Sequence, residues 1–290
     1  MVSINYHDLK IKIRDQLKPL KLDDLEFLAW FNLIAYDLFG LSKVDLIMAD
    51  YLEMTLRRQD RLDEIVIKLL NNYPIQYVLG HCYFGSLNLV IEPDVFIPRS
   101  DTLELVDRTA DIINLKEGKF THVLEVGVGS GAISISLLKK FCNLKITAID
   151  INPKACAITH KNALIHNVAH RLKIYNCDFV NFLKFYKTCA FNGIIANPPY
   201  INDEDYNNLP KPILQFESKL ALNGIDSDGL GFYRMLSANL PILACNSFLA
   251  LEIGDNQGVL VQDVLKLGQW CDINLYRDTN GLNRVITAWN

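Results

Sequence analysis

The first part of the chain repeats apolar residues at intervals of three and four, which is the spacing of a helix with one buried face. In residues 23–42 this pattern begins at two aspartates, which the helix dipole favours, and it stops at Gly40. Charged faces and apolar stripes continue over the following residues until Pro74. Because no strand pattern interrupts them, residues 1–83 are predicted to form a small helical bundle.

The pattern changes between residues 81 and 100, which are rich in aromatic and β-branched side chains. Gly85, Pro93 and Pro98 divide this stretch into short segments. Punctuated runs of this kind are typical of a β-hairpin. We therefore predict a hairpin linker over residues 84–101 that joins two domains.

Residues 102–290 alternate between short apolar runs and helical stretches. This alternation predicts an α/β domain with a parallel, doubly wound sheet, in which ligands bind beyond the carboxyl ends of the strands. The predicted strands are residues 122–128, 145–150, 171–178, 191–197, 247–254 and 284–289.

Composition excludes some classes of protein. The formal net charge of -4, from 29 Lys plus Arg and 33 Asp plus Glu, disfavours tight binding to nucleic-acid phosphates. Seven cysteines without a CxxC pair predict reduced, mostly buried thiols, and the six histidines lack ligand spacing, so no metal site is predicted. The N-terminus shows no signal segment, and no uncharged apolar run reaches about 18 residues. We expect a cytoplasmic protein without a membrane partner.

A glycine-rich loop follows the first predicted strand of the α/β domain. Its glycines are Gly127, Gly129 and Gly131, with Val128 and Ser130 between them. Glycines there let the backbone turn tightly and approach a ligand, and the next helix offers free N–H groups. The dinucleotide fingerprint prefers glycine at position 132 but tolerates Ala132, so the loop alone leaves a nicotinamide cofactor open.

Acidic and aromatic residues follow the next two strands. Asp150 ends its strand, and a carboxylate at this place can accept both hydroxyls of an adenosine ribose. Asp178 and Phe179 follow the third strand, where they could bind the amino group and cover the face of an adenine. With Glu125 before the glycines, this order resembles the class I methyltransferases, which use S-adenosylmethionine. A general nucleotide-binding α/β domain is the alternative.

The fourth predicted strand ends at Asn197-Pro198-Pro199-Tyr200. The side-chain oxygen of Asn197 and the carbonyl of Pro198 are two neighbouring acceptors, which suit an –NH₂ group with two donors. Tyr200 offers a flat face to a planar, conjugated group. These residues therefore predict catalysis on a planar nitrogen, such as a carboxamide or an aminopurine. An ordinary turn after a strand is the alternative for this motif in isolation.

Nearly the whole chain resembles one family, the HemK/PrmC protein-(glutamine-N5) methyltransferases of release factors. The resemblance rests on Gln76-Tyr77, Gly80 with Phe84, Ile97-Pro98-Arg99 and the Asn-Pro-Pro-Tyr motif. The stretches "FESKLAL", "DGLGFYR", "LEIGDNQG" and "DTNGLNRVI" then follow in family order. The implied fold is a class I, Rossmann-like methyltransferase domain preceded by a small helical bundle and a hairpin linker.

The resemblance also implies an activity: methylation of the glutamine in the Gly-Gly-Gln motif of peptide chain release factors. It implies that a helical N-terminal domain contacts the release factor and that the enzyme is a monomer. Residues 127–131, Asp150, Asp178, Phe179 and Asn197 would bind S-adenosylmethionine, and residues 197–200 would bind the glutamine.

Four positions depart from the family pattern. Ser100 replaces a proline, Leu103 replaces a glutamate, and Ser218 replaces the proline after Phe-Glu. These changes put the docking of the linker in doubt. Glu125 stands where aspartate is usual, which keeps the charge.

Two other functions stay open on the sequence. DNA adenine and ribosomal RNA methyltransferases share the Asn-Pro-Pro-Tyr/Phe motif, because the chemistry at an exocyclic amine is the same. A separate target-recognition region after the motif is not evident, and the acidic balance disfavours this class. A catalytically silent release-factor-binding module is the other alternative, although Asp150, Asn197 and Tyr200 are intact.

Overall fold

The computed structural model describes residues 2–49, 51–115, 121–185, 191–238 and 243–290. The chain divides into two compact units, residues 1–80 and 81–290. The predicted hairpin therefore belongs to the second unit, and the division lies at its start.

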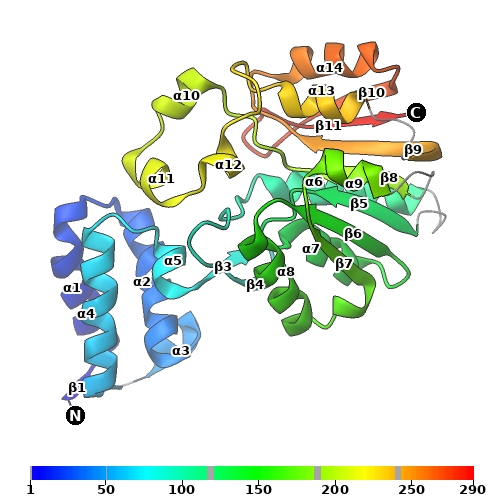
Figure 1. The fold of residues 1–290 in the computed structure, drawn as a ribbon. Helices are drawn as coiled ribbons and strands as arrows, with labels where there is room; N and C mark the ends of the chain where they lie inside the picture. The colour runs from blue at the N-terminus through cyan, green and yellow to red at the C-terminus, as the bar shows by residue number, and fades with distance from the viewer. Residues whose placement is uncertain (1, 50, 116–120, 186–190, 239–242) are drawn as a thin grey trace. The chain divides into compact units, whose positions relative to one another are not determined.

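The first unit is mainly helical (Figure 1). Buried apolar side chains from all its longer helices form one core, including Leu9, Phe31, Ile34 and Leu62. Its elements are β1 (Val2–Ile4), α1 (Tyr6–Leu17), the 3₁₀ turn η1 (Lys18–Leu20), α2 (Asp24–Phe39), α3 (Lys43–Met48), β2 (Leu52–Met54), α4 (Leu56–Leu70) and α5 (Ile75–Leu79).

The ends of α2 follow from its sequence. The Asp23 carboxylate accepts a hydrogen bond from the Glu26 N–H at 2.8 Å, which caps the N-terminus. Gly40 has a φ of 67° and donates its N–H to the Tyr36 carbonyl, which closes the C-terminus. The structure therefore confirms the predicted helix, and these two caps explain where it begins and ends.

The prediction that the N-terminal part contains no strand is wrong. β1 and β2 pair antiparallel, with Val2 opposite Met54 and Ile4 opposite Leu52. Strands of three residues are too short to show an alternating pattern, so the sequence alone predicts a continuous helical stretch across β2. Residues 42–74 accordingly form α3, β2 and α4.

The second unit begins with a hairpin and continues as an α/β domain. The hairpin spans residues 81–90, so the predicted range of 84–101 is wrong, because residues 91–101 form no strand. Its strands are β3 (His81–Phe84), β4 (Leu87–Val90), β5 (His122–Val126), β6 (Lys145–Asp150), β7 (Leu172–Asn176), β8 (Phe191–Ala196), β9 (Leu243–Glu252), β10 (Cys271–Arg277) and β11 (Asn283–Trp289). Its helices are α6 (Thr102–Leu115), α7 (Ala132–Lys140), α8 (Pro153–Ile165), η2 (Ala169–Arg171), α9 (Phe179–Phe185), α10 (Asp203–Asn207), α11 (Lys211–Phe216), α12 (Lys219–Leu222), α13 (Gly231–Ser237) and α14 (Gly258–Leu267).

Seven strands form one sheet in the order β10-β11-β9-β8-β5-β6-β7. The predicted parallel sheet is confirmed from β9 to β7 but is wrong at the other edge, because β11 runs antiparallel to both β9 and β10. Strand β10 was not predicted, because its residues are mostly exposed or half-buried. An edge strand of this kind lacks the apolar run by which the central strands were found.

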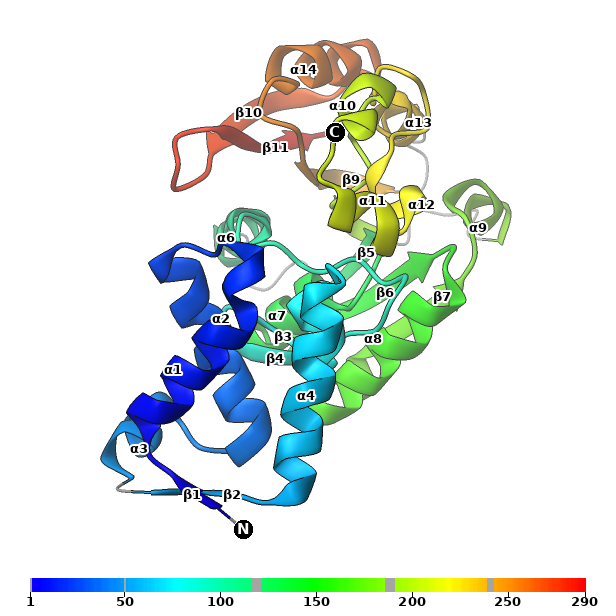
Figure 2. The same ribbon diagram turned by 90° about the vertical axis from the view of Figure 1, so that its left-hand side faces the viewer.

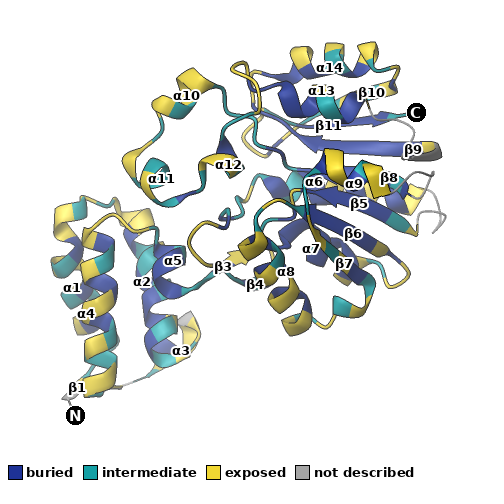
Figure 3. Cartoon of the chain, in the orientation of Figure 1, coloured by how far each residue is buried: buried dark blue, intermediate teal, exposed yellow. Residues whose placement is uncertain are grey.

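Helices cover both faces of this sheet (Figures 1 and 2). Alternate residues of the strands, such as Leu124 and Ile194, form a core with Phe182 of α9, Tyr233 of α13 and Val261 of α14. Helices α6, α7 and α8 pack against the sheet as a second group. Figure 3 shows the central strands buried and the outer sides of α8 and α14 exposed.

The central strand β5 has parallel neighbours on both sides. The chain continues from β5 to β6 on one side, whereas β8 on the other side is followed by β9 in the opposite direction across the sheet. Val126 pairs with Ile149 of β6 and with Ala196 of β8. The residues that follow these strands therefore meet at one edge of the sheet, where open α/β sheets bind ligands.

The expectation of mostly buried thiols is wrong for the described part of the chain. Of its five free cysteines, Cys82 is buried, whereas Cys142 and Cys271 are exposed. Cys189 and the side chain of Cys245 lie outside the described residues. No helix of the described part is long and apolar enough to span a membrane.

Gly193 of β8 offers a test of the packing beneath the site. A methyl group at this position would overlap the Phe248 ring on β9. We predict that Gly193→Ala lowers the free energy of unfolding by about 1–3 kcal/mol, the usual cost of overpacking. Urea denaturation followed by circular dichroism measures this change.

The double variant Gly193→Ala/Phe248→Leu is the control for that prediction. Removing the ring should make the double variant more stable than the sum of the two single effects predicts. Additive effects would contradict the proposed overlap.

Candidate active site

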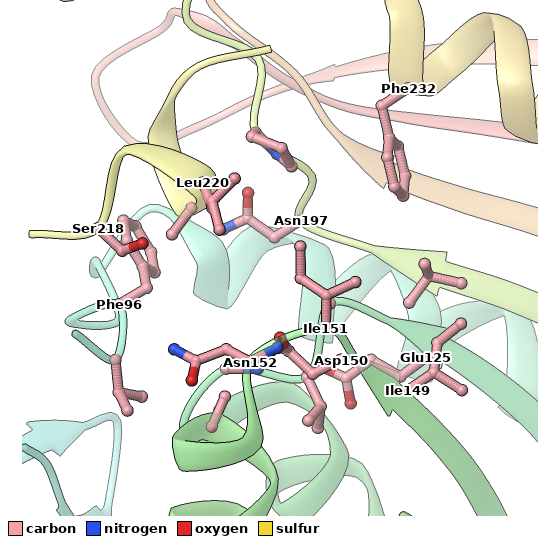
Figure 4. Close-up of a pocket in the computed structure, with 18 of the residues that line it drawn as sticks. Phe96, Glu125, Ile149, Asp150, Ile151, Asn152, Asn197, Ser218, Leu220 and Phe232 are labelled. Carbon is pink, nitrogen blue, oxygen red and sulfur yellow. Dashed lines mark hydrogen bonds between the residues drawn. The ribbon is translucent and has the colours of Figure 1, made fainter. Parts of the chain in front are cut away.

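A pocket of about 580 Å³ opens beyond the carboxyl ends of β5, β6 and β8. Figure 4 shows Asn197 and Asp150 on opposite sides of it, with Glu125 toward one end and Phe96 and Ser218 toward the other. Nine of the predicted site residues line the pocket: Gly127, Val128, Gly129, Ser130, Asp150, Asp178, Phe179, Asn197 and Pro199.

Three predicted site residues do not line the pocket. Gly131 is the N-cap of α7, with a φ of 83°. Its added Cβ would also lie 3.0 Å from side-chain atoms of Ile135 and Thr159, so only glycine fits there. Pro198 is buried, and Tyr200 packs against the core of the sheet.

Helix α8 holds the glycine loop in place. The Thr159 hydroxyl donates to the Gly129 carbonyl at 2.9 Å, and Asn162 Nδ2 donates to the Ser130 carbonyl at 2.9 Å. Asn162 Oδ1 also accepts the Val90 N–H of the hairpin at 2.8 Å. Neither side chain was predicted to belong to the site, although polar residues on the apolar face of a predicted helix are a usable signal.

Asp150 ties two loops together. Its Oδ2 accepts the Gly129 N–H and its Oδ1 accepts the Asn152 N–H, each at 2.9 Å. Burial raises the pKa of this carboxyl, and the backbone N–H groups oppose that rise. A carboxylate has about four acceptor positions, so Asp150 keeps acceptor capacity for a hydroxyl group of a ligand.

Asp178 and Phe179 have structural partners besides the pocket. Asp178 accepts the Asn181 N–H at 2.8 Å, and this bond lowers the pKa of its carboxyl at the start of α9. Phe179 is only 3 % exposed and belongs to the core of the sheet. Both residues border the pocket, and the exposed Val180 lines it beside them.

Glu125 is a buried acid in the pocket wall. It is 1 % exposed, and its Oε2 accepts a short hydrogen bond from the Ser134 hydroxyl. Its Oε1 is buried and has no hydrogen-bond partner among the described residues. Burial raises the pKa of Glu125 to about 8, although the Ser134 hydroxyl opposes that rise.

Asn197 is oriented by a residue that the sequence analysis did not assign to the site. Its Nδ2 donates to Thr102 Oγ1 at 3.2 Å, and Thr102 also lines the pocket. The carboxamide nitrogen is therefore occupied, while the oxygen accepts no hydrogen bond from the described residues. Asn197 can offer that oxygen to a donor in the pocket.

Tyr200 points to a buried acid. Its hydroxyl donates to Oε1 of Glu252, at the end of β9, over 3.4 Å. Burial, with a smaller effect of Glu252, raises the pKa of Tyr200 well above its usual range. The Tyr200 carbonyl accepts Gln257 Nε2 at 2.9 Å, and a side chain at Gly229 would collide with that carbonyl. The "LEIGDNQG" and "DGLG" stretches therefore fix the conformation of the motif.

The linker after the hairpin forms another wall of the pocket. Asn152 Nδ2 donates to the Asp94 carbonyl at 2.7 Å, and Lys154 pairs with the Asp94 carboxylate at 2.6 Å. Arg99 forms a short ion pair with the buried carboxylate of Glu217. Phe96, between these attachments, lines the pocket but was not predicted as a site residue.

The three departures from the family pattern other than Glu125 occupy ordinary positions. The Ser100 hydroxyl donates to Asp101 at 3.4 Å. Leu103 lies beside the hairpin turn, 3.3 Å from where a Cβ of Gly85 would be. Ser218 lines the pocket at the start of α12. None of them disturbs the hydrogen bonds of Asp150 or Asn197.

Comparisons with known proteins agree with this architecture. Residues 12–80 match the family model of the PrmC N-terminal domain, and residues 104–224 match that of the methyltransferase small domain. A solved structure from Streptococcus mutans, a candidate S-adenosylmethionine-dependent methyltransferase, has the same fold with a TM-score of 0.50. It is 12 % identical and covers 72 % of this chain and 55 % of its own.

Curated relatives carry one name. A release factor glutamine methyltransferase from Bacteroides thetaiotaomicron is 31 % identical, over 88 % of this chain and 90 % of its own length. One from Bacillus anthracis is 32 % identical, over 85 % of this chain and 87 % of its own length. Identity at this level across both units and the site shows that the chain belongs to the release factor glutamine methyltransferase family.

Proposed function

We propose that the chain transfers a methyl group from S-adenosylmethionine to the side-chain nitrogen of the glutamine in the Gly-Gly-Gln motif of peptide chain release factors. The names of its relatives support this substrate. The observation that carries the proposal is the free carboxamide oxygen of Asn197, a residue that lines the same pocket as the glycine loop and Asp150.

The pocket residues suit S-adenosylmethionine. A volume of about 580 Å³ is ample for a ligand of this size. Asp150 would bind the ribose hydroxyls, and Asp178 with Phe179 would border the adenine. Glu125, with its unpartnered Oε1, would hold a cationic group, because a buried carboxylate needs a counter-charge.

The bound cofactor supplies an electrophilic methyl group on a sulfonium. The carboxamide oxygen of Asn197 would accept one N–H of the substrate glutamine, and the Pro198 carbonyl would accept the other. These bonds draw electron density toward the nitrogen and fix its direction of approach. The ring of Tyr200 does not line the pocket. Tyr200 would instead stabilise the conformation of the motif through its hydrogen bond to Glu252.

The helical unit is proposed to bind the body of the release factor. Its helix α3 carries three exposed apolar side chains, Val44, Ile47 and Met48, which a partner can cover. We expect a monomer that meets the release factor in the cytoplasm, without a stable nucleic-acid partner, in keeping with its net charge of -4.

Mass spectrometry of a release factor tests the proposed reaction. After incubation with the chain and S-adenosylmethionine, we expect one added methyl group on the Gly-Gly-Gln glutamine. Asn197→Ala should slow this transfer by about 100-fold or more, because the nitrogen loses its alignment. Asn143→Ala, at an exposed asparagine outside the pocket lining, is the control.

Other outcomes would change the assignment. Methyl incorporation into DNA or ribosomal RNA, without transfer to the release factor, would favour an exocyclic-amine methyltransferase. Cofactor binding without transfer to any of these substrates would favour a silent binding module.

The raised pKa of Glu125 predicts proton release on cofactor binding. Between pH 6 and 7.5 this carboxyl is mainly protonated in the free chain, since its pKa is about 8. A bound cation stabilises the carboxylate, so the Kd for S-adenosylmethionine should fall with rising pH, by up to about tenfold per pH unit. Calorimetry in buffers of different ionisation enthalpy counts the released proton.

Glu125→Gln should bind the cofactor more weakly and release no proton. Glu53→Gln, at an exposed glutamate outside the pocket lining, should leave both properties unchanged. Undiminished proton release in Glu125→Gln would show that another group supplies the proton.

Charges on α3 test the role of the helical unit. We expect Val44→Glu/Met48→Glu to raise the KM for a release factor about tenfold, or ~1.4 kcal/mol, with kcat unchanged. Transfer to a short Gly-Gly-Gln peptide should be unaffected. Leu267→Glu, at an exposed leucine of α14, is the control. Equal KM values for wild type and double variant would place the docking surface elsewhere.

A further inference from the structure

A chain of buried polar groups runs from the site to the end of β9. Asn197 Nδ2 donates to Thr102 Oγ1, the hydroxyl of the first residue of α6. The Thr102 hydroxyl lies close enough to the Glu252 carboxyl to lower its pKa, and Tyr200 donates to Oε1 of the same group. Thr102 and Glu252 are each 2 % exposed, so water does not compete for the Asn197–Thr102 and Tyr200–Glu252 hydrogen bonds.

The donor and the acceptor in each of these hydrogen bonds follow from the number of protons that each group can donate. A hydroxyl has one proton to donate, and the lone pair of Thr102 already accepts Asn197 Nδ2. Glu252 Oε2 is a buried acceptor without a hydrogen-bond partner among the described residues. An ionised Glu252 can only accept, and the Thr102 hydroxyl lowers the pKa of this carboxyl. We therefore infer that the Thr102 proton is directed toward Glu252, because Thr102 Oγ1 accepts from Asn197.

We propose that Thr102 and Glu252 are positioning residues that keep the carboxamide oxygen of Asn197, and not its nitrogen, directed into the pocket. The reversed carboxamide would present two donors to a substrate –NH₂ group, which is itself a donor. This inference deepens the proposed function and rests on it, because the orientation matters only for an acceptor that carries N–H groups.

The surroundings of Glu252 determine when it is ionised. Burial raises its pKa to about 7, Arg284 and the Thr102 and Tyr200 hydroxyls oppose that rise, and Asp101 adds to it. Arg284 is held by Asp278 at 3.1 Å and by Asp101 at 3.6 Å. On α13, the Tyr233 hydroxyl donates to the backbone carbonyl of Glu252 at 2.9 Å.

This arrangement predicts a pH dependence. Protonated Glu252 can donate to Thr102, which frees the hydroxyl to donate toward Asn197 and favours the reversed carboxamide. The carboxylate form increases as the pH rises through about 7, so kcat should rise between pH 6 and 8. The ionisation of Glu125 affects the Kd for S-adenosylmethionine, so at saturating cofactor it does not contribute to the pH dependence of kcat.

The test compares Thr102→Val with Thr102→Ser in release-factor methylation from pH 6 to 9. Valine leaves Asn197 Nδ2 without a buried acceptor, so the productive orientation is penalised and kcat should fall about 10- to 100-fold. The rise of kcat with pH should disappear, while the Kd for S-adenosylmethionine stays within about twofold. Serine restores the hydroxyl, and it should restore both the rate and the pH profile.

Two further variants separate positioning from packing. Thr109→Val removes another buried hydroxyl of α6, one without a hydrogen-bond partner among the described residues, and should leave kcat unchanged. Glu252→Gln, which cannot ionise, should lose the pH dependence of kcat even where its melting temperature matches that of the wild type.

Each outcome decides between the alternatives. A wild-type kcat and pH profile in Thr102→Val would overturn this inference and leave the proposed function intact. Equal losses in Thr102→Ser and Thr102→Val would assign Thr102 a packing role and would also overturn it. Absence of transfer by the wild-type chain would overturn the proposed function itself, and this inference with it.

Discussion

The parallel pairing of β5 with β6 and β8 is the constraint on which the site depends. Val126 lies beside Ile149 on one side and Ala196 on the other, so the three strands end at the same level. The glycine loop, Asp150 and Asn197 each continue one of these strands. Without this pairing, the glycine loop could still bind a nucleotide but would have no reaction centre beside it. The Asn-Pro-Pro-Tyr motif would then be a turn with no cofactor nearby.

Buried side-chain amides and hydroxyls fix the loops that this pairing brings together. Asn162 joins the glycine loop to the hairpin, and Gln257 joins the Gly254 N–H to the Tyr200 carbonyl. A buried polar group without a partner costs about 1–3 kcal/mol, so each bond resists movement of its loop. The site residues are therefore held in position before a ligand arrives, which lowers the entropy cost of aligning reactants.

Two glutamates near the ends of β5 and β9, Glu125 and Glu252, show the cost of such a site to the stability of the fold. Glu125 and Glu252 are nearly inaccessible to water, and burial raises the pKa of each, to about 8 and about 7. Between its unfolded and folded pKa, each group binds protons more tightly in the folded chain, so its contribution to stability decreases as the pH rises. Buried carboxyl groups with a raised pKa lower the stability of an ordinary core. They are common at functional sites, where they balance the charge of a ligand or orient a proton.

Local signals let the sequence determine much of this protein. The helix from Asp23 to Gly40 and the strand from Lys145 to Asp150 were predicted correctly, because periodicity, caps, glycines and prolines act over a few residues. For the same reason the residues predicted for the site lie at the ends of four parallel strands. Only the tertiary structure decided the antiparallel edge, the short β1–β2 sheet and the partners of Asn197 and Tyr200. Those partners, Thr102 and Glu252, lie 95 and 52 residues away, and no local pattern specifies contacts over such separations.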